Sequence, residues 1–327
     1  MSQVGHRLAL LGATGAVGAE ILRVLEARSL PVAELRAFAS ARSEGELLEL
    51  HGAELEVEVL SPGCLAGVDL LWVAAPGVLE SLLPDLGDCA IVDLSGVLEL
   101  DPMVPLYLPG VTLPGRRAAV PRGVATGLAL ALRPLARECG LARVSATTLE
   151  SASGAGRRGL EELQQQTLHL LSALDGEVGE GSVFPQPLAF DCLPRVGDFA
   201  DDDETFEERR LRHVLRRALG RPDLLVELTR VRVPVFMGAL AVVHAELHKP
   251  LELSQLAELW QAEPALRLLS NRDLPTPRVA AAHDAVQVGR VRLAPGGERL
   301  AFVVALDPLR RGAALGAVEA ARLLLGE

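Results

Sequence analysis

The stretch Leu8-Ala-Leu-Leu-Gly-Ala-Thr-Gly-Ala-Val-Gly-Ala-Glu20 decides the fold class of this chain. Apolar residues run into three glycines, and the apolar residues that follow them recur at helical spacing. The pattern predicts a strand, a tight turn and a helix. A phosphate can approach backbone N–H groups where no Cβ intervenes, and the N-terminus of the helix adds a favourable partial charge. The turn is therefore interpreted as a pyrophosphate-binding loop formed by Gly12, Thr14, Gly15, Ala16, Val17 and Gly18.

A glycine-rich turn in an ordinary α/β sheet is the alternative, since the glycine spacing departs from the commonest dinucleotide fingerprint. The position directly after an apolar strand near the N-terminus favours dinucleotide binding. A second strand is expected over residues 35–40, and no carboxylate stands at its end to hold ribose hydroxyls. Ser40, Arg42 and Ser43 instead offer donors suited to a 2′-phosphate, which favours NADP. A solvated surface arginine is the other interpretation of Arg42.

Composition excludes several classes of protein. The 327 residues carry a formal net charge of −11 with basic and acidic residues interleaved, which argues against nucleic acid as a partner. The four cysteines are widely spaced, so neither a metal site nor a disulfide framework is expected. No apolar run approaches the ~20 residues of a membrane helix, and no basic leader is found. We expect a cytoplasmic protein without a membrane segment.

The order and spacing of the expected strands and helices predict two domains. Near-continuous apolar runs at 68–75 and 90–94 are typical of buried parallel strands. They predict a doubly wound parallel sheet over residues 1–122, completed by a C-terminal helix within 308–327. Alternating residues from 142 onwards predict an antiparallel strand and an α+β domain over 123–307. Further strands are expected at 224–235, 240–247, 286–293 and 300–306, with helices at 128–136 (interrupted at Arg133-Pro134), 160–171, 205–219 and 312–325.

Six motifs occur in a characteristic order: Gly12-Ala-Thr-Gly-Ala-Val-Gly, Ala39-Ser-Ala-Arg-Ser, Ser153-Gly-Ala-Gly, Phe199-Ala-Asp-Asp-Asp-Glu-Thr-Phe-Glu-Glu, Arg232-Val-Pro-Val-Phe-Met-Gly and Arg311-Gly-Ala-Ala. Together they resemble the aspartate-semialdehyde dehydrogenase family over nearly the whole chain. The resemblance implies a Rossmann-type domain followed by an α+β catalytic and dimerisation domain with a mixed sheet. It also implies a dimer through that second sheet and a relation to amino-acid biosynthesis.

In that family a cysteine thiolate attacks the aldehyde, a histidine takes the proton, and hydride leaves for NADP. Phosphate then releases the thioester as an acyl phosphate. Counting back from Ala131-Leu-Arg-Pro-Leu places the family's cysteine at Gly123. The resemblance places the histidine at Ala239, the glutamine at Glu150 and a phosphate-binding arginine at Glu99, where a carboxylate repels phosphate. A covalent mechanism needs its nucleophile, so no catalytic residue is expected in this chain.

Part of the substrate-binding shell matches the family. Arg232, Glu207 and Arg210 stand at positions that resemble its substrate contacts, whereas Arg122 and Pro308 replace asparagines. Residues 205 and 208 also have the spacing of a capping box, which accounts for the acidic residues there without a ligand.

Other chemically active residues are poor replacements. His244 lies five positions from Ala239 on the same expected strand, so it should point to the opposite face. Cys89 and Cys192 are expected in the core.

The favoured hypothesis is a catalytically inactive homologue, similar to the Usg-type paralogues of bacteria, that retains the fold, the dimer interface and residual NADP binding. It is expected to form a homodimer, with a heterodimer with an active paralogue as the other possibility. The alternative is an NADP-dependent oxidoreductase that acts on an aldehyde or carbonyl substrate. That enzyme would use Glu150 as proton donor.

Overall fold

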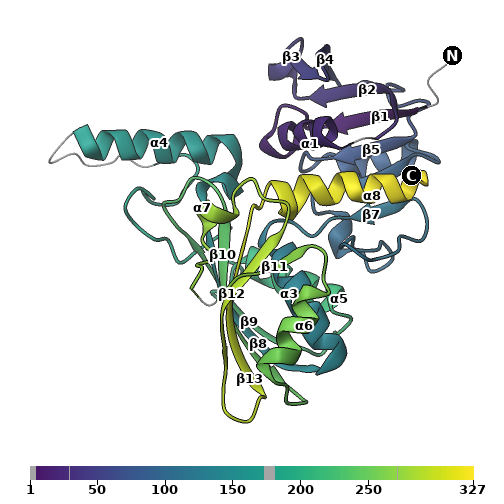
Figure 1. Cartoon of the computed structure of the whole chain (residues 1–327). Coiled ribbons are helices and arrows are strands. Elements are labelled where there is room, and N and C mark those ends of the chain that lie inside the picture. Colours follow the sequence, from purple (N-terminus) through teal and green to yellow (C-terminus); the bar gives the residue numbers. More distant parts are fainter. Residues whose placement is uncertain (1–4, 29, 173–180, 271) are drawn as a thin grey trace. The chain divides into compact units, whose positions relative to one another are not determined.

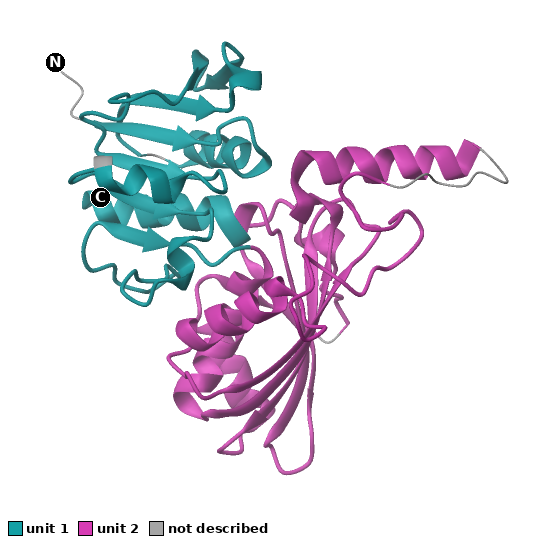
Figure 2. Cartoon of the chain, turned by 180° about the vertical axis from the view of Figure 1, so that it is seen from behind, with its two compact units in different colours: residues 1–122, 312–327 teal, residues 123–311 magenta. Residues whose placement is uncertain are grey.

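The chain folds into two compact units in the computed structural model, which describes residues 5–28, 30–172, 181–270 and 272–327 (Figure 2). Unit 1 comprises Met1–Arg122 and Gly312–Glu327, and unit 2 comprises Gly123–Arg311. Each unit contains its own sheet. None of the helices within the described ranges is long and apolar enough to cross a membrane.

The sheet of unit 1 is almost entirely parallel, with strand order β3-β4-β2-β1-β5-β6-β7. The chain leaves β1 towards β2 on one side and later crosses to β5, β6 and β7 on the other, so the strand order reverses at β1. This arrangement confirms the expected doubly wound sheet, in which ligands bind outside the carboxyl ends of the strands at the reversal. The strands are β1 (His6–Leu11), β2 (Val32–Ala39), β3 (Leu47–Leu50), β4 (Ala53–Val59), β5 (Leu70–Val73), β6 (Ala90–Asp93) and β7 (Arg117–Ala119).

Helices α1 (Ala16–Ala27) and α8 (Leu315–Leu325) supply much of the core of unit 1, together with the strand residues they cover (Figure 1). The buried face of α8 is rich in glycine and alanine, which lets the helix approach the sheet closely. The indole Nε1 of Trp72 in β5 donates to the carbonyl oxygen of Ala317 at 3.0 Å. The C-terminal helix thus belongs structurally to the N-terminal unit. A short helix, α2 (Leu79–Leu82), also lies in unit 1.

The sheet of unit 2 is mixed, with strand order β11-β12-β13-β10-β8-β9, which confirms the expected α+β class. The strand expected to be antiparallel, β8, pairs antiparallel with β10 but parallel with β9. The hairpin expected across residues 295–297 forms between β12 and β13. The strands are β8 (Leu141–Glu150), β9 (Leu225–Arg232), β10 (Ala239–Leu247), β11 (Leu266–Leu268), β12 (Val286–Leu293) and β13 (Arg299–Leu306).

Helices α3 (Val124–Glu138), α5 (Phe206–Ala218) and α6 (Leu253–Gln261) cover one face of this sheet (Figure 1). The expected interruption at Arg133-Pro134 is wrong, because α3 continues through Pro134 to Glu138. The surrounding packing explains this, since every residue from Val124 to Leu135 is buried and holds the helix in place. Unit 2 also contains α4 (Gly156–Ser172) and α7 (Pro277–Ala280).

Candidate functional site

The glycine loop of unit 1 connects β1 to α1 at the reversal of strand order. Gly12 has a φ of 87°, and a Cβ at Gly18 would lie only 2.2 Å from the carbonyl oxygen of Gly12. Both glycines are therefore required by the local packing alone. Gly15 is the N-cap of α1 and provides no side chain to cap the helix, so the first-turn N–H groups at Ala16 and Val17 face outward without intrahelical partners. This geometry suits an anion.

A second group of residues meets this loop from the end of β2. The hydroxyl of Thr14 donates to Ser43 Oγ at 3.3 Å. Ser43 lies in the 3₁₀ turn Ala41–Ser43 that follows β2, and both Ser40 and Arg42 of this segment are exposed. The structure thus brings Thr14 and Ser43 together and keeps the Arg42 guanidinium in solvent on the same short turn.

The loop after β6 contains a buried carboxylate that forms an ion pair with a partly exposed arginine. Asp93 holds this loop, because its Oδ1 accepts from the Ser95 N–H at 2.8 Å and its Oδ2 from the Leu98 N–H at 2.7 Å. Glu99 follows and is buried, and its Oε2 lies 3.8 Å from the Arg122 Nε. The expected repulsion of phosphate by Glu99 is therefore reduced, since Arg122 neutralises the carboxylate from within the chain.

Gly123 begins α3 in a backbone conformation that favours glycine. Its φ is 58° and its ψ is −126°, a region that side-chain-bearing residues rarely adopt. A Cβ built there would have space, since the nearest atom is the Pro308 Cβ at 3.8 Å. The obstacle to a side chain at this position is therefore backbone strain and not crowding.

Glu150, at the end of β8, forms a two-pronged ion pair with Arg230 of β9. Arg230 Nε donates to Glu150 Oε1 at 2.7 Å, and Nη2 donates to Oε2 at 2.8 Å. Thr148 Oγ1 donates to the same carboxylate at 2.7 Å. Burial alone would raise the pKa of Glu150, but the charge and hydrogen bonds of Arg230 hold that pKa below its ordinary value. Glu150 is therefore ionised at neutral pH.

Ala239, the first residue of β10, lies directly opposite Glu150 in the register of the sheet. Its other neighbour across the sheet is Leu306 of β13, and Ala239 itself is buried. The preceding Gly238 has a φ of 88°. The methyl group of Ala239 offers no proton acceptor to its neighbours.

Arg232 lies at the end of β9 and lines a pocket of about 460 Å³ within unit 2. Only 7% of this residue is exposed, and its Nη1 donates to the Ser151 carbonyl oxygen at 2.6 Å. Glu207 lies nearby and accepts from Arg230 Nη1 at 3.0 Å, while Arg210 Nη1 lies 3.8 Å from its other oxygen. The three residues of the expected substrate shell are thus in one region, but Glu207 is already bonded to Arg230.

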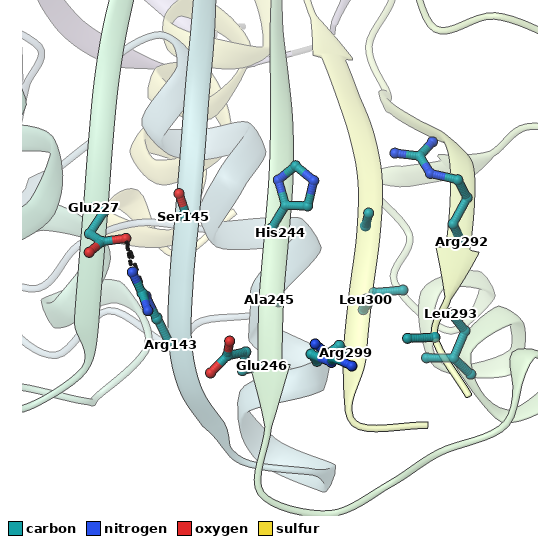
Figure 3. Close-up of a pocket in the computed structure, with 12 residues that line it drawn as sticks. Arg143, Ser145, Glu227, His244, Ala245, Glu246, Arg292, Leu293, Arg299 and Leu300 are labelled. Carbon is teal, nitrogen blue, oxygen red and sulfur yellow. Dashed lines mark hydrogen bonds and ion pairs between the residues drawn. The ribbon is translucent and has the colours of Figure 1, made fainter. Parts of the chain in front are cut away.

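His244 points away from this region, as expected from its spacing. In β10 the odd-numbered residues from Ala239 to Leu247 are buried, whereas His244 and Glu246 are exposed on the other face. Figure 3 shows His244 on that outer face beside Ser145, with Arg143 and its partner Glu227 on the neighbouring strands. His244 is therefore no replacement for the histidine at position 239.

The cysteines behave differently from one another. Cys89 is buried as expected, and burial raises the pKa of its thiol to about 11. The expectation for Cys192 is wrong, because this residue is exposed. The next residue, Leu193, bonds to the backbone of Arg232 and is buried, so Cys192 turns outward.

Two family models match the chain in succession. Residues 7–116 match the NAD-binding domain of semialdehyde dehydrogenases, and residues 132–311 match their dimerisation domain. The sequence is also 34% identical over 346 residues to the aspartate-semialdehyde dehydrogenase of Mycolicibacterium smegmatis, covering 98% of this chain and 99% of that protein. The chain belongs to the aspartate-semialdehyde dehydrogenase family.

Solved structures of aspartate-semialdehyde dehydrogenases have the same architecture. Aspartate semialdehyde dehydrogenase II from Vibrio cholerae superposes with a TM-score of 0.93 at 32% identity, covering 99% of both chains. The Candida albicans enzyme with NADP superposes with a TM-score of 0.71 at 18% identity, which supports the fold alone. Membership in the aspartate-semialdehyde dehydrogenase family gives this chain an NAD(P)-binding domain and a dimerisation domain.

Arg230, which bonds to both Glu150 and Glu207, was not predicted from the sequence. A signal for it exists: Arg230 and Arg232 are two apart on one strand, so they share a face that is otherwise apolar. Two cations on such a face require nearby carboxylates.

Proposed function

We propose that this chain is a catalytically degenerate member of the aspartate-semialdehyde dehydrogenase family, similar to the Usg-type paralogues. The observation that carries the proposal is Gly123, which has no nucleophilic atom and adopts a backbone conformation that a cysteine disfavours. Loss of the nucleophile from a covalent enzyme costs about a million-fold in rate, and losing its partners as well adds little.

Ala239 and Glu150 support the same proposal. The position assigned to the family's histidine carries a buried methyl group. The alternative function, a reductase with Glu150 as proton donor, is not favoured, because Arg230 keeps this carboxylate ionised at neutral pH. A group with a lowered pKa has no proton to donate there.

The proposed cofactor of the chain is NADP. The glycine loop with Thr14 would hold the pyrophosphate, and Ser40, Arg42 and Ser43 would hold the 2′-phosphate. The fit is supported by the outward N–H groups of α1 and by the absence of a carboxylate at the end of β2. NADP, when bound, supplies a hydride acceptor. The residues of this chain would orient it.

The proposed assembly is a homodimer formed through the outer face of the sheet in unit 2. The match to the dimerisation domain supports it, as does the exposed charged face around His244 in Figure 3. Co-expression with an active paralogue tests the heterodimer. If native mass spectrometry detects a mixed dimer, the heterodimer takes the place of the homodimer in this proposal.

Activity measurements test the loss of catalysis directly. The chain is purified from a host without an aspartate-semialdehyde dehydrogenase of its own and assayed with the semialdehyde, phosphate and NADP. We expect no turnover, against the ~10 s⁻¹ of an ordinary enzyme. Turnover at that pace would overturn the proposal.

Two variants at position 123 sharpen the test. Gly123→Ala and Gly123→Cys impose the same strain at a φ of 58°, but only the second adds a thiol. We expect both to be inactive. Rapid turnover by Gly123→Cys alone would show that the loss is confined to one atom and that the rest of the machinery is intact.

A further inference from the structure

Arg232 is a buried cation, and most of the N–H donors of its guanidinium have no partner in the described part of the chain. The one hydrogen bond of its side chain within the described part of the chain runs from Nη1 to the Ser151 carbonyl oxygen, and no described carboxylate lies within ion-pair distance. A guanidinium has five N–H donors. Gly154 leaves room for this group, since a Cβ there would lie 2.6 Å from Arg232 Nη1. The remaining donors are available to an anion in the pocket that Arg232 lines.

The carboxylates whose charges act on Arg232 are those of Glu150 and Glu207. Arg230 bonds to both: Nε and Nη2 hold Glu150, and Nη1 donates to Glu207 Oε2 at 3.0 Å. The Glu207 side chain packs against Gly197, a wall residue of the pocket, so its charge would otherwise reach a ligand there.

Two other carboxylates of this region are also engaged. Glu162 accepts from the backbone N–H groups of Ser182 and Val183, both at 2.8 Å, and so fixes one wall of the pocket. Asp198 pairs with Arg195 at 2.8 Å, and its side chain is 89% exposed. Water weakens the pull of an exposed carboxylate on a ligand cation. The pocket thus offers a buried positive charge, while the carboxylates near it already have partners within the chain.

We propose that Arg230 sets the ligand class of this pocket: a small carboxylate without an ammonium group, held by Arg232. An α-amino acid would bring an ammonium group that needs a carboxylate. Engaging Glu207 or Glu150 in this way would require breaking charge-assisted hydrogen bonds of Arg230. The inference rests on the proposed function only in that the ligand is bound and not consumed.

Succinate and L-aspartate are the probes, because they differ by one amino group. Dissociation constants are measured by calorimetry at neutral pH for the full chain. We expect succinate to bind at least about tenfold more tightly than aspartate, and Arg232→Met to abolish succinate binding.

The double variant Glu150→Gln/Arg230→Met removes the hydrogen bond of Arg230 to Glu207 without leaving Glu150 as a buried, unpaired charge. Arg210, 3.8 Å from the other oxygen of Glu207, is unchanged. In this variant we expect the preference for succinate to disappear or reverse. Thermal unfolding checks that the variant is folded.

Three outcomes would overturn the inference: equal or tighter binding of aspartate to the natural chain, an unchanged preference in the double variant, or no binding of either probe at about 50 mM, well above the Kd of a weak site. None of these outcomes affects the proposed loss of catalysis, because that proposal is tested by turnover. Conversely, if the chain turned over substrate but kept its preference for succinate, only the proposed function would be overturned.

Discussion

Replacement of Arg230 by methionine removes the counter-ion of Glu150 and retains a long apolar side chain. Three side-chain hydrogen bonds to carboxylates are lost, two to Glu150 and one to Glu207. Breaking a buried ion pair from one side costs about 3–5 kcal/mol. Arg232 and Thr148 still stabilise the Glu150 carboxylate, so we expect about 3 kcal/mol, the lower end of that range, at neutral pH.

The loss should depend on pH in a definite direction. In the natural protein the pKa of Glu150 is lower when folded than its ordinary value of 4.5, so its contribution to stability is present above that value and lost as pH falls below it. Without Arg230, burial should raise the pKa of Glu150, and the folded variant should take up a proton as pH falls. We therefore expect the destabilisation to shrink from about pH 7.5 to about pH 5.5.

Urea unfolding gives the free energy of unfolding for each variant. The matched control is Arg23→Met, because Arg23 is largely exposed and forms an ion pair with Glu20 within α1, outside the proposed dimer face. The control should not change stability measurably. A loss of less than about 1 kcal/mol for Arg230→Met, or a loss that is constant with pH, would refute this reasoning.

Three further predictions concern the cofactor loop and the thiols. Gly18→Ala should destabilise the chain by about 1–3 kcal/mol and abolish NADP binding, because the new Cβ would overlap the loop backbone; thermal unfolding with and without NADP measures both. Arg42→Ala should weaken NADPH binding about tenfold and leave NADH unchanged in a fluorescence titration, whereas Arg117→Ala, another exposed arginine, should change neither. At about pH 8 a thiol reagent should modify exposed Cys192 rapidly but spare Cys89 until the protein unfolds, because Cys89 is buried and the pKa of its thiol is about 11. Mass spectrometry of labelled peptides measures the order of reaction, and earlier labelling of Cys89 would contradict the prediction.

The strands and helices of the core were predictable because their apolar periodicity is regular. The strand expected at 240–247 corresponds to β10, and the helix expected at 205–219 corresponds to α5 with the expected capping box at Thr205. The hairpin of β3 and β4 was missed, although apolar residues alternate with glutamates throughout β4, a pattern that indicates a strand. The parallel partner of β8 was missed because register between distant strands is a tertiary property.

The candidate site was predictable only in part for a similar reason. A family motif fixes the positions of Gly123 and Ala239, but it gives no partner for residues that depart from the family pattern. Glu99 and Glu150 each appeared as an isolated carboxylate in the sequence. In the structure, arginines distant in the sequence neutralise both. Such compensation becomes visible only when strands and loops are placed in space.

The membership of α8 in unit 1 has a consequence for synthesis on the ribosome. The chain emerges from its N-terminus, so the sheet of unit 1 is made long before the helix that covers the indole of Trp72. All of unit 2 must emerge first. A prematurely terminated chain would therefore display an uncovered apolar surface to chaperones and proteases, and only a finished polypeptide can hide it.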